Sequence, residues 1–212
     1  MPHRRSYHHG NLREALIEAA ITLIEQSGPH SFSLAEAARR AGVSAAAPYR
    51  HFKGRDDLLE EIARRGYVEF AETMERAYAD GRPDPLAALA RVGERYLQFS
   101  RERPGYYMAM FESDISITAH TELYAAEQRS IGLLIRASEA LAERLPKDDR
   151  PPSRMVANHI WAMSHGVVEL FSRGKQGARS PISAEDMLSS GVTIYLRGLG
   201  LLGPADQPRA GG

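Results

Sequence analysis

The chain has 212 residues, of which 43% are hydrophobic and 25% charged, so it can bury a core in one large or two small domains and is not disordered by composition. It contains no cysteine, which excludes disulfides and thiolate-bound metals. No apolar run approaches membrane-spanning length and residues 1–14 lack the apolar segment of a signal peptide, so we expect a soluble, cytoplasmic protein without a membrane partner.

Positive charge is concentrated near the N-terminus, although the formal net charge of the chain is zero. Residues 1–55 carry eight Lys or Arg against four Glu, or +4, and the remainder carries 19 basic and 23 acidic side chains, or −4. A basic head on an acidic body is typical of a DNA-binding domain joined to a part that does not touch DNA. Random scatter of surface charge is the alternative.

Helical periodicity dominates the chain and no strand alternation is evident, which predicts an all-α fold. The first helix is expected to be capped by Asn11, with Glu14 three residues later, and to end at Ser-Gly-Pro, residues 27–29. Its apolar face is expected to contain Leu12, Leu16, Ala19 and Leu23.

Residues 32–59, FSLAEAARRAGVSAAAPYRHFKGRDDLL, contain two short helices joined by a tight turn. Ser33 can cap the first of these helices, Glu36 can close a capping box, and Gly42 can supply the left-handed stop. The second helix is expected over about residues 45–52. Two helices joined by a short turn that contains Gly form the helix-turn-helix pattern, in which the second helix enters the major groove of DNA.

Pro48 is unusual in this second helix, because a proline cannot donate the amide hydrogen bond that the fourth helical residue normally makes. It also disfavours helical geometry at Ala47. We therefore expect the start of the second helix to be loosened or tightened locally.

The segment LAEAARRAGVSAAAPYRHFKGRDDLL resembles the signature of TetR-family transcriptional regulators in its AGVS turn, its YRHF run and the Lys followed by a Leu-Leu pair. The opening YHHGNLREALIEAA and the later IWAMSHGVVELFSRG resemble the subgroup whose C-terminal domain carries a Trp and a His-Gly pair. The resemblance implies an N-terminal three-helix DNA-binding domain and a C-terminal helical domain for ligand binding and dimerisation, about nine helices in all.

We expect the DNA-binding domain, with a basic arm, over residues 1–54, the effector-binding and dimerisation domain over 55–203, and a flexible tail over 204–212. A helix over about residues 56–80 is expected to link the two domains. Further helices are expected at 84–103, at 106–111, from 118 or 121 to about 145, at about 154–172 and from the cap at 183 to about 202.

The early turns of the second helix, which reach bases and phosphates, carry alanines that form no side-chain hydrogen bonds, so base readout must depend on Arg50, Ser44 and DNA shape. The resemblance implies phosphate contacts from Tyr49, His51, Lys53 and Arg55. It also implies that the N-terminal arm follows the DNA backbone or enters the minor groove. A core position is the alternative for Tyr49. The predicted DNA-binding residues are Arg4, Arg5, Ser33, Ser44, Ala45, Ala46, Tyr49, Arg50, His51, Lys53 and Arg55.

The adjacent His8 and His9 have no third ligand at a fixed spacing, so we predict no metal site and no cofactor. In the C-terminal half, Trp161, His165 and Glu169 share a helix face. With aromatic and Met side chains elsewhere they form either a pocket or an ordinary core. The resemblance implies an inducer site, for which the candidates are Tyr96, Phe99, Tyr107, Met108, Phe111, Trp161 and His165.

The last two helices each carry an apolar face, and the resemblance implies that they form a four-helix interface between two copies of the chain. A monomeric core is the alternative. The candidate interface residues are Val156, Ile160, Val167, Phe171, Met187, Gly191, Ile194, Tyr195, Gly198 and Leu202.

Together these features predict a homodimeric repressor that a small hydrophobic or amphipathic effector releases from a palindromic operator. A related DNA-binding protein without an inducer is the first alternative. An enzyme that uses His165 and Glu169 is a remote one, because no nucleophile elbow, glycine-rich phosphate loop or metal-ligand cluster is present. We therefore expect no enzymatic activity.

Overall fold

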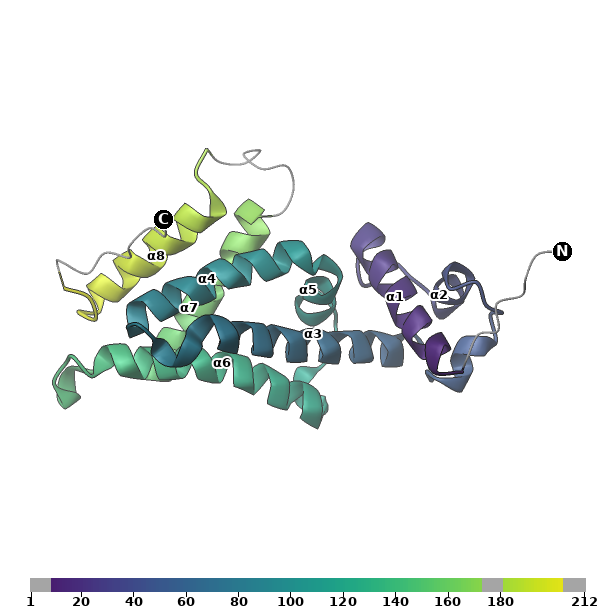
Figure 1. The fold of residues 1–212 in the computed structure, drawn as a ribbon, viewed down its shortest axis with the longest axis horizontal. Coiled ribbons are helices and arrows are strands. Elements are labelled where there is room, and N and C mark those ends of the chain that lie inside the picture. The colour runs from purple at the N-terminus through teal and green to yellow at the C-terminus, as the bar shows by residue number, and fades with distance from the viewer. Residues whose placement is uncertain (1–8, 173–180, 204–212) are drawn as a thin grey trace. The chain divides into compact units, whose positions relative to one another are not determined.

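A computed structural model describes residues 9–172 and 181–203, and in this part of the chain it contains α-helices, short 3₁₀ and π segments and no strand (Figure 1). The predicted all-α fold is confirmed. The expected arm and tail, with Arg4 and Arg5, lie outside the described residues. The α-helices are α1 His9–Ser27, α2 Leu34–Arg40, α3 Arg55–Tyr78, α4 Pro85–Glu102, α5 Pro104–Phe111, α6 Thr121–Ala142, α7 Ser153–Val167 and α8 Ala184–Gly198.

The chain divides into two compact units. Unit 1 comprises Met1–Val68 and Arg103–Tyr124, and unit 2 comprises Glu69–Glu102 and Ala125–Gly212. The helix α3 is continuous and contributes to both units. The functional domain boundary expected after residue 54 stays a prediction.

Two expectations about the first helices are wrong. The helix α1 begins at His9, not at a cap on Asn11, because a capping pattern permits a start but does not stop a helix from extending upstream where no proline intervenes. The expected second short helix over 45–52 is a 3₁₀ helix, η1, limited to Ala47–Arg50. Pro48 supplies the reason, because it lacks the amide that would continue an α-helical ladder.

The core of unit 1 is formed by α1, α2, Phe52 and the first half of α3. Its fully buried side chains include Leu16, Ile17, Ala20, Ile24, Leu58 and Ile62. Leu23, which was expected on this face, is only half-buried. The helix α5 packs on α1 at Gly105, where an added Cβ would lie 2.6 Å from Cγ2 of Ile21. A larger residue at this position would force the side chains of Ile21 and Glu25 on α1 to move.

In unit 2, α4 packs against α7 and α8. The ring of Phe70 on α3 meets Tyr96 and Phe99 edge to face, with centroids 5.3 and 5.1 Å apart. The helix α8 begins at the expected cap, where the Ser183 hydroxyl accepts the Asp186 amide at 3.0 Å. The expected helix over 154–172 is α-helical only to Val167 and continues as a π-helical turn, Val168–Ser172.

A charged cluster joins α1 to α3 within unit 1. The Glu61 carboxylate accepts hydrogen bonds from Arg13 at 3.1 Å, Arg64 at 2.9 Å and Arg65 at 2.7 Å. Arg65 also donates to both carboxylate oxygens of Glu14, at 2.6 and 2.7 Å. Burial raises the pKa of Glu61, but the three guanidinium donors outweigh it and lower the pKa to about 2.

The lowered pKa of Glu61 predicts a loss of stability in acid. The carboxylate stabilises the fold above its unfolded-state pKa, near 4.5, and this contribution disappears as the pH falls from there towards about 2. We expect Glu61→Gln to lower the free energy of unfolding at pH 7 by roughly 1–2 kcal/mol and to remove this part of the acid dependence. Urea unfolding at pH 7 and pH 3 measures both effects.

Glu18→Gln is the matched control, because Glu18 is an exposed carboxylate on the same helix, α1. Equal unfolding free energies for wild type and Glu61→Gln at pH 7 would show that the cluster does not stabilise unit 1.

Candidate DNA-binding surface and ligand pocket

The first element of the candidate DNA-binding surface, α2, is capped as the sequence predicts. The Ser33 hydroxyl accepts the Glu36 amide at 3.2 Å, and the Glu36 carboxylate accepts the Ser33 amide at 2.9 Å. The hydrogen bond from the Ser33 amide is the main cause that lowers the pKa of Glu36, so this carboxylate is charged at neutral pH. The Ser33 hydroxyl also donates to Glu36, at 3.0 Å, and a DNA contact would compete with this capping box.

A tight turn follows α2. Gly42 has φ +73, a left-handed conformation that favours glycine, and the Val43 amide donates to the Ala38 carbonyl at 3.0 Å. The Ala47 amide then donates to the Ser44 carbonyl at 3.0 Å, which leads the chain into η1. The helix-turn-helix connection predicted from Gly42 is therefore present.

The segment 44–53, which we call the reading segment, combines buried anchors with exposed polar groups. Pro48 and Phe52 are buried, whereas the side chain of Tyr49 is 64% exposed, so the alternative of a core position for Tyr49 is wrong. The exposed residues are Ser44, Ala45, Ala46, Tyr49, Arg50 and Lys53, and His51 is half-buried. Pro48 thus holds η1 against the core while its neighbours face outward.

The cations near the reading segment differ in their freedom to meet phosphate. Lys53 has an exposed side chain, and its backbone amide is held by the Asp57 carboxylate at 2.8 Å. Arg55 donates to Asp56 at 2.7 Å and to the Pro29 carbonyl, and its guanidinium lies 5.2 Å from the centre of the Phe32 ring. A phosphate contact from Arg55 would have to compete with these interactions, so Lys53 is the better candidate.

Sequence reasoning missed two further candidates, Arg39 and Arg40. Both are exposed in the last turn of α2, and the first helix of a helix-turn-helix crosses the DNA backbone. The signal that could have found them is the Arg-Arg pair directly before the turn.

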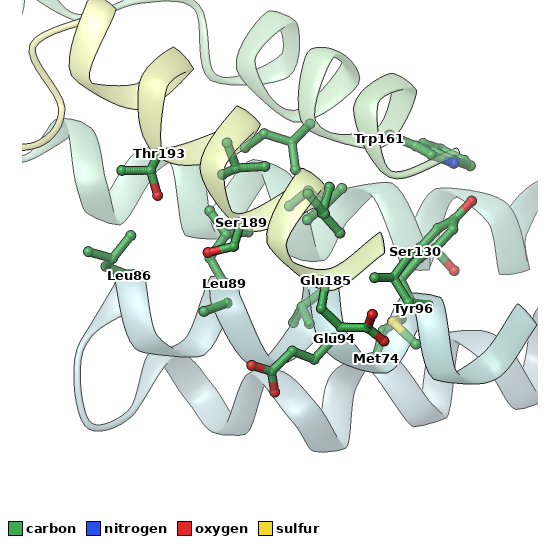
Figure 2. Close-up of a pocket in the computed structure, with 18 of the residues that line it drawn as sticks. Met74, Leu86, Leu89, Glu94, Tyr96, Ser130, Trp161, Glu185, Ser189 and Thr193 are labelled. Carbon is green, nitrogen blue, oxygen red and sulfur yellow. The ribbon is translucent and has the colours of Figure 1, made fainter. Parts of the chain in front are cut away.

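Unit 2 contains an apolar pocket of about 260 Å³ (Figure 2). Its wall is formed mainly by α4 and α8, and Phe70 and Met74 of α3 also line it. Two of the predicted effector residues, Tyr96 and Trp161, line the pocket. Trp161 is the single tryptophan of the chain, which makes it an intrinsic fluorescent reporter of the pocket.

The other predicted effector residues lie elsewhere. Phe99 packs on Phe70, and His165 does not line the pocket, although its Nδ1 lies 3.4 Å from the hydroxyl of Tyr96, which does. The remaining three, Tyr107, Met108 and Phe111, belong to α5 in unit 1. There the rings of Tyr107 and Phe111 pack together, with centroids 4.9 Å apart. The aromatic residues of α5 suggested a place in the effector pocket, but their number alone did not show that α5 packs in unit 1.

The lining from α4 and α8 was missed at the sequence level. Its main members are Leu86, Leu89, Gly93, Glu94, Leu188 and Ser189. Gly93 was the available signal, because a glycine inside a helix often marks a close approach. An added Cβ there would lie 3.2 Å from Cδ2 of Leu188.

Large apolar side chains are exposed on α7, on the π-helical turn that follows it and on α8. They are Met155 at 40%, Leu170 at 54% and Ile194 at 70% exposure, and among the described residues nothing lies within 4 Å of a Cβ added at Gly198. Beside them, His159 Nδ1 and the Tyr195 hydroxyl are 2.7 Å apart. Met187, Gly191 and Phe171 are partly exposed.

Four residues predicted at the dimer interface are instead buried within the single chain. Their exposures are 1% for Val156, 3% for Ile160, 8% for Val167 and 6% for Leu202. Because α7 is apolar on more than one side, its periodicity alone did not distinguish the face that packs on its own chain from the face that is exposed.

The capped α2, the glycine turn and the outward-facing reading segment define a helix-turn-helix DNA-binding protein. Two family models match the chain: "Bacterial regulatory proteins, tetR family" over residues 16–62 and "Tetracyclin repressor-like, C-terminal domain" over residues 89–195. The chain belongs to the TetR family and is a DNA-binding transcriptional regulator. Its assignment to the subgroup with the Trp and His-Gly pattern stays a prediction.

Similar proteins agree with this assignment. The chain is 27% identical over 100 residues to the uncharacterized HTH-type transcriptional regulator YobS of Bacillus subtilis. These 100 residues cover 47% of this chain and 51% of YobS. It is 28% identical over 194 residues to the HTH-type transcriptional regulator BetI of Brucella suis, a match that covers 88% of this chain and 92% of BetI. A solved structure of a protein of unknown function from Rhodococcus sp. RHA1 superposes on this chain with a TM-score of 0.74 and 25% sequence identity. The match covers 92% of this chain and 98% of that one.

The match to YobS thus spans about half the length of that relative. Among the described residues, no helix is both long and apolar enough to cross a membrane.

The reading segment predicts different effects for two cations. We expect Lys53→Ala to weaken binding equally on specific and nonspecific DNA, because a phosphate contact carries no sequence information. We expect Arg50→Ala to relax specificity by about 1–3 kcal/mol, because a base contact is lost. Gel shifts on a site selected from random DNA and on a scrambled duplex measure both effects.

Lys147→Ala, which removes an exposed cation from unit 2, is the control and should leave both affinities unchanged. An Arg50→Ala variant with undiminished preference for the selected site would remove Arg50 from the base-reading residues.

Proposed function

We propose that this regulator is a homodimeric repressor that leaves its operator when a small hydrophobic or amphipathic molecule binds in the unit 2 pocket. The observation that carries the proposal is the pocket itself, about 260 Å³ with a mainly apolar wall. A well-formed apolar pocket with a few polar groups is the usual form of a small-molecule site. It lies in the unit that does not contain the reading segment.

The helix α3 provides the physical link for release. It begins at Arg55, next to the reading segment, and carries Phe70 and Met74 in the pocket lining. A ligand changes DNA affinity only if it binds one arrangement of the protein better than another. A tenfold loss of operator affinity requires about 1.4 kcal/mol of such coupling, which the displacement of a helix that belongs to both units can supply.

The exposed apolar side chains on α7, the π-helical turn after it and α8 support the dimer. Met155, Leu170 and Ile194 are large apolar side chains that a second copy would cover, and Gly198 leaves space for close approach. A two-fold dimer carries two reading segments, which suits a pseudo-palindromic operator with half-sites roughly 34–36 Å apart. The proposed interface includes the predicted Gly191, Ile194, Tyr195 and Gly198 and omits the predicted residues that are buried.

The test of ligand release uses Trp161 as the reporter. Ligands found by a thermal-shift screen of small apolar and amphipathic compounds are titrated with and without the selected operator. We expect them to change Trp161 fluorescence, to weaken operator binding by tenfold or more at saturation, and to lose affinity by the same factor when operator is present.

Leu89→Trp, which fills the pocket from α4, should abolish the ligand response and preserve operator binding in the absence of ligand. A regulator whose ligands bind at Trp161 but leave operator affinity unchanged would contradict the proposal and favour the alternative without an inducer.

The dimer predicts that Ile194→Asp separates the subunits, because an unpaired carboxylate would enter an apolar interface. We expect monomers in sedimentation at micromolar concentration and at least a tenfold loss of operator affinity, although the reading segment is unchanged. Tyr124→Asp is the control, because Tyr124 is 45% exposed on α6 and lies outside the proposed interface. A stable Ile194→Asp dimer would place the interface elsewhere.

A further inference from the structure

The charged side chains that line the pocket all have the same sign. Glu94 on α4 and Glu185 and Asp186 on α8 contribute carboxylates, and among the described lining residues there is no Lys, Arg or His. Figure 2 shows the Glu185 side chain extending from the first turn of α8 toward α4, which carries Glu94 and Tyr96. The sign of this lining constrains the charge of the ligand.

Nearby positive charge offsets the three carboxylates only in part. Arg101 donates to the Glu185 carboxylate at 2.5 Å, and the Ser183 hydroxyl donates to Asp186 at 2.7 Å. The N-terminus of α8 adds roughly half a positive charge. Burial raises the pKa of Glu185, but the hydrogen bond and the charge of Arg101, together with a backbone hydrogen bond, outweigh it and lower the pKa, so this group is charged at neutral pH. The rim of the pocket therefore remains negative.

Glu94 has no ion-pair partner within the described residues, and its side chain is exposed at the rim. Its carboxylate is thus available to a ligand without the loss of an existing salt bridge. A partly dehydrated cation at this position would gain more from the carboxylate than it would in bulk water, since solvent screening is weaker beside an apolar wall.

The rest of the pocket also suits an organic cation. Trp161 and Tyr96 present aromatic side chains, whose ring faces attract ammonium groups, and Leu86, Leu89 and Leu188 supply apolar surface. An engineered cavity of about 150 Å³ accepts benzene. A pocket of about 260 Å³ accommodates an aromatic ring with an attached trimethylammonium group.

We propose that this pocket selects amphipathic organic monocations, with the ammonium head at the Glu94 and Asp186 rim and the apolar body against α4, α8 and Trp161. The inference rests on the proposed function, because it concerns the same pocket. An organic anion would meet three carboxylates and, among the lining residues that the structure describes, no cation, and a neutral compound would use only the apolar wall.

The test uses three probes of similar shape and different charge: phenyltrimethylammonium, tert-butylbenzene and benzenesulfonate. Calorimetry and Trp161 fluorescence measure their binding to the full-length protein at low and high salt. We expect the cation to bind about tenfold or more tightly than the neutral probe, the anion to bind most weakly, and salt to reduce only the advantage of the cation.

Variants at the rim locate the effect. Glu94→Gln should lower the affinity for phenyltrimethylammonium about three- to tenfold and leave the affinity for tert-butylbenzene unchanged. Glu94→Lys should lower the affinity for phenyltrimethylammonium further and raise the affinity for benzenesulfonate. Glu139→Gln is the matched control, because Glu139 is an exposed carboxylate of unit 2 that does not line the pocket.

Equal affinity for the cation and the neutral probe, equal effects of Glu94→Gln and Glu139→Gln, or failure of all three probes to bind would each overturn the charge selectivity. These outcomes are distinct from failure of the proposed function. Release of operator by tert-butylbenzene would sustain a ligand-released repressor while refuting selectivity. Tight, Glu94-dependent binding of the cation without any change in operator affinity would sustain selectivity while refuting release.

Discussion

The uninterrupted helix α3 is the constraint on which the account depends. Leu58 and Ile62, in its first half, are fully buried in the core of unit 1, and Phe70 and Met74, further along, line the pocket of unit 2. An α-helix of 24 residues is roughly 36 Å long and cannot shorten without the loss of backbone hydrogen bonds. In the proposed mechanism, a ligand that moves the half of α3 at the pocket acts on the other half through this continuous backbone.

The charged side chains also differ between the DNA-binding surface of unit 1 and the pocket of unit 2. The reading segment presents Arg50 and Lys53 to solvent, whereas the pocket rim carries Glu94 and Asp186. Opposite signs at the two sites attract opposite ligands, namely polyanionic DNA and, as proposed, organic cations. The net charge of zero conceals this separation, which the count of charges along the sequence already indicated.

Features encoded by neighbouring residues could be predicted from the sequence, and features that depend on packing partners could not. The Ser33 capping box and the Gly42 turn depend on a few adjacent residues, and both predictions are confirmed. The aromatic α5 and the apolar α7 are different, because periodicity shows that a face is buried but not which element covers it. Pro48 is an intermediate case: its lost amide was evident, but its burial as the anchor of η1 was not.

The most direct test of the account is the coupling between pocket ligand and operator in a protein whose α3 is weakened between its two halves. Val68→Gly loosens the helix by about 1 kcal/mol relative to the matched Val68→Ala. The coupling factor is the ratio of ligand affinities with and without operator. We expect Val68→Ala to keep the wild-type factor and Val68→Gly to reduce it, while the pocket ligand and the operator still bind each variant alone. An unchanged factor in Val68→Gly would contradict a coupling carried by α3.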